Sequence, residues 1–99
     1  MRKIKILVMY PNKQPEVKEI RSNIGRLYGI IYYPYKEIEL EKNVYLLYSE
    51  EAEGIGLPLC RKFRNLNIYS NFAIIGKETD ELVTLTKSQI NKYYELFSI

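Results

Sequence analysis

Residues 28–48 read YGIIYYPYKEIELEKNVYLLY and contain two β-prone runs separated by a proline and a glutamate-rich segment. The first run, residues 28–33, ends at Pro34 and predicts an outer strand, because proline cannot donate a hydrogen bond within a central strand. The second run, residues 43–48, predicts another strand, and we expect the two runs to pair. The glutamate-rich segment between them predicts a connection or a short edge strand.

Upstream of these runs, the sequence predicts a strand and then a helix. Residues 4–10 are apolar on both faces in their later half, which is typical of an interior strand. Pro15 suits the first turn of a helix. The apolar residues that follow recur at helical spacing: Val17, Ile20, Ile24 and Leu27. We therefore expect a helix over residues 16–27.

Downstream, short elements alternate with turns. Glutamates precede Gly54 and predict a solvated turn in which this glycine takes a positive φ. Residues 55–59 predict a short strand, and residues 60–67 predict an irregular loop or a helical turn. Residues 72–75 are apolar and predict a short buried strand that ends at Gly76.

The last element is a helix with a clear start signal. Thr86 and Gln89 have the spacing of a capping box, and Leu85 can pack against Ile90 as a hydrophobic staple. The residues expected on its inner face are Ile90, Tyr93, Tyr94 and Phe97. We expect this face to pack on the sheet.

This order of elements predicts an α+β fold. With 99 residues, 46% of them hydrophobic, we expect residues 1–99 to form a single two-layer domain. Its sheet would have four or five strands, mostly antiparallel or mixed, with two helices on one face. The opposite face would be partly open, with Lys3, Lys5 and some tyrosines near it.

The composition excludes several classes of protein. The chain has no histidine and one cysteine, so it cannot form an internal disulfide or the usual zinc sites. We expect no metal and no cofactor. No apolar run approaches the roughly 18 residues that cross a bilayer, so we expect a cytoplasmic protein with no membrane partner.

Catalytic chemistry has few candidate residues. Cys60 lies beside Arg61 and Lys62, which can lower the pKa of a thiol, but no histidine is available as its base. A single cysteine is usually a small buried hydrophobe. We therefore expect no enzymatic activity and assign no catalytic residue, with a thiol-dependent enzyme as the alternative.

The net charge of +3 is small, but the charges form blocks. Residues 1–36 carry eight lysines or arginines and two glutamates, whereas residues 37–59 carry six glutamates and one lysine. Such blocks are typical of solvated faces and, in some proteins, of binding patches that orient a partner.

Tyrosine is the one marked excess, with ten residues. Tyrosine side chains are enriched at interfaces because each combines a large apolar ring with a polar tip. The expected contact residues for a protein partner are Tyr32, Tyr33, Tyr35, Arg61 and Arg64. An unpaired aromatic edge strand could also form a homodimer.

A second hypothesis is binding of a nucleic acid or a nucleotide-like signal molecule. Basic side chains would contact phosphates while tyrosines stack on bases. The basic candidates are Lys3, Lys5, Arg61 and Arg64. The glutamates of residues 37–53 would repel the same phosphates, so we favour a protein partner.

Several segments together resemble domain-of-unknown-function family 3846. They are residues 11–20 (PNKQPEVKEI), Glu50-Glu51, residues 56–61 (GLPLCR), residues 72–76 (FAIIG) and Leu85-Thr86. The chain departs from the family pattern at Cys60, where asparagine is usual, and at Tyr28-Gly29, where two glycines are usual. The resemblance implies an accessory protein of a phage, plasmid or other mobile element that acts by occupying a host or defence component. It supplies no catalytic residues.

Overall fold

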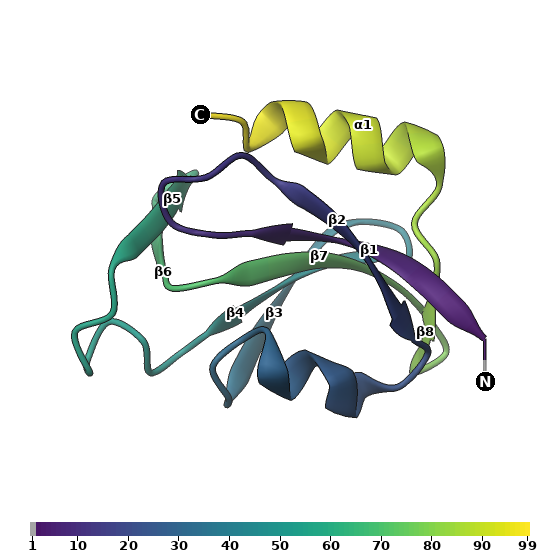
Figure 1. Ribbon diagram of the computed structural model, residues 1–99, viewed down its shortest axis with the longest axis horizontal. Helices are drawn as coiled ribbons and strands as arrows, with labels where there is room; N and C mark the ends of the chain where they lie inside the picture. Colours follow the sequence, from purple (N-terminus) through teal and green to yellow (C-terminus); the bar gives the residue numbers. More distant parts are fainter. Residues whose placement is uncertain (1) are drawn as a thin grey trace.

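The computed structural model describes residues 2–99, except for the side chain of Ile24 (Figure 1). It contains eight strands, one 3-10 helix and one α-helix. In chain order the elements are β1 (Lys3–Met9), β2 (Glu16–Arg21), the 3-10 helix η1 (Ile24–Gly29), β3 (Tyr35–Glu41), β4 (Val44–Ser49), β5 (Leu59–Phe63), β6 (Leu66–Tyr69), β7 (Phe72–Glu78), β8 (Glu81–Val83) and α1 (Lys87–Leu96).

Six strands form one antiparallel sheet in the order β2-β1-β7-β4-β3, with β8 paired to the end of β7. Ile74 lies at its centre, opposite Leu7 of β1 and Leu46 of β4. β5 and β6 form a separate antiparallel hairpin. The prediction of a mostly antiparallel sheet is confirmed, but the sheet has more strands than expected.

The sheet has a hydrophobic core on each face because its central strands are apolar on both sides. Along β7, Phe72 and Ile74 contribute to the core under α1, whereas Ala73 and Ile75 contribute to the core that includes Leu27 of η1. We call these sides the α1 face and the η1 face. Figure 1 shows α1 and η1 on opposite sides of the sheet. The prediction of two helices on one face, with the other face partly open, is therefore wrong.

The helix predicted over residues 16–27 is also wrong. Residues 16–21 form the edge strand β2, paired with β1 from Glu16↔Val8 to Arg21↔Lys3. Val17 and Ile20 are β-branched, and such residues pack as well in strands as in helices. Residues 16–21 form a strand rather than a helix because the backbone of β1 provides them with a complete ladder of hydrogen bonds. Helical structure begins only after Asn23, whose side chain accepts a hydrogen bond from the Gly25 N–H.

Residues 28–33 do not form the predicted strand. They lie at the end of η1 and in the loop that precedes β3, and the Tyr33–Pro34 peptide bond is cis. The glutamate-rich segment forms the edge strand β3, one of the two structures expected for it, and β3 takes the place beside β4 that was predicted for residues 28–33. Ile38 and Leu40 pack against the core of the α1 face. The alternation of apolar and acidic residues is the stronger strand signal, since it matches a half-buried edge.

The segment between β4 and β7 differs from expectation in three places. The glycine with positive φ is Gly56, at 82°, and not Gly54. The strand expected over residues 55–59 is absent, because regular structure there begins at Leu59. Residues 60–67 belong to the β5–β6 hairpin rather than to a loop, with Arg64 in its turn at a φ of 57°. The strand predicted over residues 72–75 is confirmed and continues to Glu78.

The C-terminal helix is confirmed with its start signal. The Thr86 hydroxyl oxygen accepts from the Gln89 N–H at 3.1 Å, and the Gln89 side-chain oxygen accepts from the Thr86 N–H at 2.9 Å. Tyr93 and Phe97 are buried and Ile90 packs beside them. Tyr94 is 39% exposed, so its assignment to the inner face is wrong. Its side chain leaves the helix about 100° around the axis from Tyr93.

Candidate interaction surface

Three tyrosines pack against one another on the η1 face. Tyr28 comes from η1, Tyr33 from the following loop, and Tyr35 is the first residue of β3. The ring centroids are 5.1 Å apart for Tyr28 and Tyr33, 5.4 Å for Tyr33 and Tyr35, and 5.7 Å for Tyr28 and Tyr35. Two of these contacts are edge-to-face, the geometry that aromatic rings prefer. We call this set the tyrosine cluster.

The members of the tyrosine cluster differ in exposure. Tyr28 is 57% exposed and Tyr33 is 61% exposed, so most of each side chain faces solvent. Tyr35 is half-buried and packs against the core of the η1 face. Tyr35 therefore forms the base of the cluster, and the other two rings form its outer surface.

The hydroxyl of Tyr35 is buried and has no hydrogen-bond partner among residues 2–99. Burial, with smaller contributions from the neighbouring phenols of Tyr28 and Tyr33, raises the pKa of Tyr35 to about 12. Desolvation has this effect because it disfavours the charged phenolate. The base of the cluster thus stays neutral at physiological pH.

Tyr32 also faces solvent, with 48% of its surface exposed. The predicted contact residues Tyr32 and Tyr33 are thus both exposed, and Tyr33 packs on the half-buried Tyr35. Sequence reasoning missed Tyr28 as a member of this surface. The chain reverses after η1, where the Ile31 N–H donates to the Leu27 carbonyl, and this reversal places Tyr28 beside Tyr33. The strand expected at residues 28–33 has no such reversal.

Arg61 lies in the interior and not on a contact surface; it is only 9% exposed. Its Nε donates to the Phe97 carbonyl oxygen at 2.8 Å, and its Nη1 donates to the carbonyl oxygens of Tyr10 at 3.1 Å and Cys60 at 2.9 Å. Its Nη2 donates to the carbonyl oxygen of Lys13. The guanidinium thus joins β5, the β1–β2 loop and the end of α1, and we remove it from the candidate surface.

Arg64 is exposed in the turn of the β5–β6 hairpin, and its guanidinium lies over the Phe63 ring at 4.7 Å from the centroid. This hairpin packs on the core of the α1 face through Cys60 and Ile68, whereas the tyrosine cluster borders the core of the η1 face. Figure 1 shows the hairpin beside the C-terminal end of the chain. The structure therefore does not bring Arg64 and the tyrosines together.

Cys60 is buried in the core of the α1 face, as a small hydrophobe would be. Burial raises the pKa of its thiol to about 11 even though the charge of Arg61 acts to lower it. The thiolate is the nucleophilic form of cysteine. The thiol is therefore protonated at neutral pH and poorly suited to nucleophilic attack.

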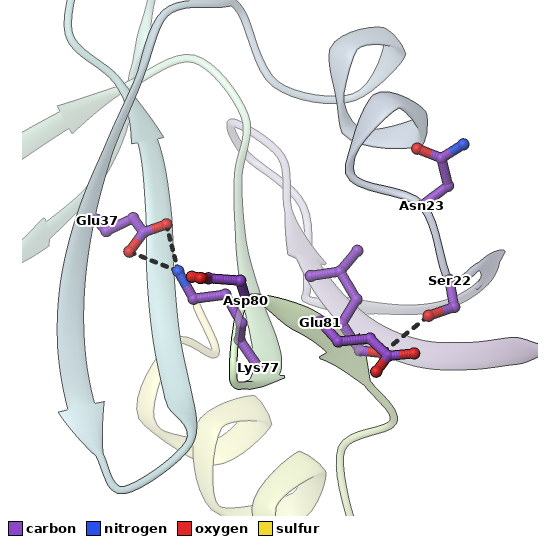
Figure 2. A pocket seen from close by; sticks show the side chains of 7 residues that line it. Ser22, Asn23, Glu37, Lys77, Asp80 and Glu81 are labelled. Carbon is purple, nitrogen blue, oxygen red and sulfur yellow. Dashed lines mark hydrogen bonds and ion pairs between the residues drawn. The ribbon is translucent and has the colours of Figure 1, made fainter.

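A shallow hollow of about 430 Å³ lies between η1 and the β7–β8 turn (Figure 2). Lys77 Nζ contacts both carboxylate oxygens of Glu37, at 3.0 and 2.9 Å, and lies 4.7 Å from the centroid of the Tyr45 ring. The hydrogen bond to Glu37 raises the pKa of Lys77. At the other end, the Ser22 hydroxyl donates to the Leu82 carbonyl at 2.8 Å. The Lys77–Glu37 pair therefore joins β7 to β3 across β4, and the Ser22 hydroxyl is already bound to the main chain.

Residues 4–98 match the family described as "Domain of unknown function (DUF3846)". The chain belongs to this family. No curated protein and no solved structure gives a significant match to the chain. The resemblance seen in the sequence is thereby confirmed over nearly the whole chain. Because the family description names no activity, the function has to be argued from the surface of the molecule.

The basic residues of the second hypothesis lie apart from the tyrosine cluster. Lys3 and Lys5 alternate along β1 with Ile4 and Ile6, which are buried in the core of the η1 face. Successive side chains of a strand point to opposite faces, so both lysines lie on the α1 face. The expectation that they lie near the same open face as the tyrosines is wrong.

Among residues 2–99, none of the helices has the length and hydrophobicity that spanning a membrane requires.

Proposed function

We propose that this DUF3846 protein is a non-enzymatic protein-binding domain that docks through the tyrosine cluster together with Tyr32. We also propose that it works in the cytoplasm as an accessory protein of a mobile element, where it occupies a host or defence component. The observation that carries the proposal is the exposure of Tyr28 and Tyr33, 57% and 61%, although both rings pack in an ordered cluster. The mobile-element origin rests on the family resemblance alone.

Ordered, exposed aromatic rings are suited to binding. A tyrosine ring that already packs on its neighbours has little rotamer freedom left to lose when a partner covers it. Its apolar surface then contributes through burial, and its hydroxyl can still form a hydrogen bond. Tyrosine is accordingly enriched among the residues that dominate interface energetics.

Charge near the tyrosine cluster favours a basic partner. Glu37, Glu39 and Glu50 are exposed on β3 and just after β4. Lys77 pairs with Glu37 at 2.9 Å and Lys36 with Glu50 at 3.2 Å, so Glu39 carries the unpaired negative charge among these three glutamates. A negative potential at the edge of a binding surface raises the rate of encounter with a positively charged partner. It also repels nucleic acid, which is why a protein partner remains our preferred hypothesis.

Capture from an extract of the native host tests this proposal. Immobilised wild-type protein is compared with Tyr33→Ser and with the control Tyr94→Ser, which removes a tyrosine exposed on α1. We expect a protein that is captured by the wild type and by Tyr94→Ser but not by Tyr33→Ser. The thermal midpoints of all three proteins should lie within a few degrees of one another, because neither side chain belongs to a hydrophobic core.

Equal capture by the two variants would contradict the proposal. A titration with a labelled oligonucleotide at two salt concentrations covers the second hypothesis. Tight binding at low salt that weakens steeply with added salt would favour a nucleic-acid partner instead.

A further inference from the structure

We propose that the partner docks as an extended strand on the free edge of β3, and that its docking segment alternates basic and apolar residues. This inference rests on the proposed function, because it treats the tyrosine cluster and β3 as one continuous surface. Tyr35 belongs to both, as the base of the cluster and as the first residue of β3. A strand added to β3 would meet the rings of Tyr28 and Tyr33 at one end.

The edge of β3 offers main-chain hydrogen bonds. β3 is the last strand in the sheet order, and within residues 2–99 it pairs with β4 alone. Alternate N–H and C=O groups along its outer side therefore face solvent. Such an edge is a template for an added strand, in which main-chain bonds supply affinity and side chains supply specificity. The irregularity between Glu39 and Glu41 limits regular pairing to residues 35–39.

The side chains of β3 define what the added strand should carry. Glu37 and Glu39 share the η1 face; Glu37 is paired with Lys77, whereas Glu39 is exposed with no ion-pair partner among residues 2–99. Ile38 and Leu40 point to the α1 face and are half-buried. A lysine or arginine opposite Glu39 gains a favourable cross-strand pair, one opposite Glu37 can share its carboxylate with Lys77, and an apolar residue opposite Ile38 gains burial. Because these positions alternate, the matching segment alternates basic and apolar residues.

The same chemistry disfavours a second copy of the chain as the occupant. If two β3 strands paired, Glu37 and Glu39 of one copy would lie near the same residues of the other. Like charges opposite each other destabilise a strand pair. The other edge strand, β2, places Lys18 and Ile20 on one face and Val17 and Glu19 on the other, so it lacks the alternating pattern. We therefore do not propose a homodimer through β3; the homodimer considered from the sequence was through an aromatic strand at residues 28–33, which does not form.

Fluorescence anisotropy with labelled peptides tests this inference. The probe is a short peptide in which lysine and valine alternate, and the control peptide carries glutamate in place of each lysine. We expect the lysine peptide to bind roughly fivefold more tightly than the glutamate peptide, since the cross-strand pair with Glu39 changes sign. Glu39→Lys should weaken binding of the lysine peptide by a similar factor. The matched variant Glu16→Lys, on the opposite edge strand, should leave binding unchanged.

Amide hydrogen exchange in the complex locates the bound peptide. Slower exchange in β3, with no change in β2, would support the inference. Equal binding of the two peptides, no binding of either, or protection of β2 would overturn it. Self-association of the protein through β3 in analytical ultracentrifugation would overturn it too. If Tyr33→Ser fails to capture the host protein and the lysine peptide also fails to bind, the proposed function stands but docking on β3 does not.

Discussion

Arg61 shows how one residue can join three parts of a small fold. Its guanidinium lies in the interior and donates to the main-chain carbonyls of Tyr10, Lys13, Cys60 and Phe97. A planar fork of five N–H donors can satisfy several acceptors at once, whereas a lysine ammonium cannot reach them in the same geometry. Buried carbonyls left without a donor are costly. Arg61 is therefore a structural residue.

We expect Arg61→Ala to lower the free energy of unfolding by about 3 kcal/mol, because it removes charge-assisted hydrogen bonds and leaves the carbonyls of Cys60 and Phe97 buried without this donor. Urea denaturation measures this change. Arg64→Ala is the matched control, since Arg64 is exposed in a turn, and should change stability by no more than about 0.5 kcal/mol. Similar effects of the two substitutions would refute the structural role of Arg61.

A buried thiol and two tyrosine hydroxyls, which ionise by losing a proton, predict a loss of stability at high pH. The pKa of Cys60 rises from 9.0 to about 11 on folding, and that of Tyr35 rises from 10.0 to about 12. Burial and a hydrogen bond to Glu41 also raise the pKa of Tyr93. Below pH 9 these groups hold their protons in both states. Above it the unfolded chain loses protons that the folded chain retains, so the free energy of unfolding falls as pH rises.

Urea denaturation at pH values from 7 to 11 should therefore show a free energy of unfolding that begins to fall near pH 9 because of these groups. In Cys60→Ala the decline should begin nearer pH 10, where the tyrosines of the unfolded chain start to ionise. The same onset in both proteins would show that the buried thiol does not contribute to it.

The sequence could predict the role of a residue only where that role does not depend on where the chain turns back on itself. Arg61 and Arg64 are of one type and three positions apart, so no local pattern separates the buried residue from the exposed one. Their difference arises because residues 60–67 form a hairpin that turns at Arg64 and faces Arg61 toward the end of α1. The burial of Cys60, in contrast, follows from its ordinary preference for the interior.

At the scale of elements, the close approach of β7 and β8 depends on Gly76. A Cβ at this position would lie 2.7 Å from the Val83 carbonyl oxygen, which is main chain and cannot move aside cheaply. Gly76 is also opposite Val44, so it is enclosed by strands on both sides. The glycine thus allows β7 to pair with β4 and β8 at the same point.

Gly76→Ala should lower the free energy of unfolding by about 2 kcal/mol through overpacking. Gly29→Ala is a suitable control, because a Cβ there meets nothing within 4 Å. It should be neutral or slightly stabilising, since alanine restricts the unfolded chain more than glycine does. Thermal denaturation of both variants tests the pair, and a well-tolerated Gly76→Ala would contradict the steric argument.

Elements with their own local signals were predictable, and those decided by pairing were not. The capping box of Thr86 and the two-faced apolar pattern of β1 are local, and both are confirmed. Residues 16–27 carry a helical stripe, yet residues 16–21 become β2 because β1 supplies backbone partners. Tertiary pairing of this kind overrides a weak local preference.

At the scale of the whole molecule, placement of the helical segments decides where the candidate surface lies. The sequence predicted an antiparallel sheet, and the structure confirms it, but two helices on one face would have left the tyrosines on an open sheet. Instead η1 covers the second face and carries Tyr28 to the side of Tyr33. The exposure of Tyr32 and Tyr33 was predictable, whereas the cluster required a chain reversal that no local pattern indicates.

The most direct test of the central claim is photo-crosslinking from the tyrosine cluster. The protein is made with p-benzoylphenylalanine in place of Tyr33, and a second protein carries it in place of Tyr94 on α1. Both are irradiated in an extract of the native host. Our account predicts a defined crosslinked host protein from position 33 that is absent from position 94. Crosslinks of equal pattern from both positions, or a host protein crosslinked from position 94 alone, would contradict it.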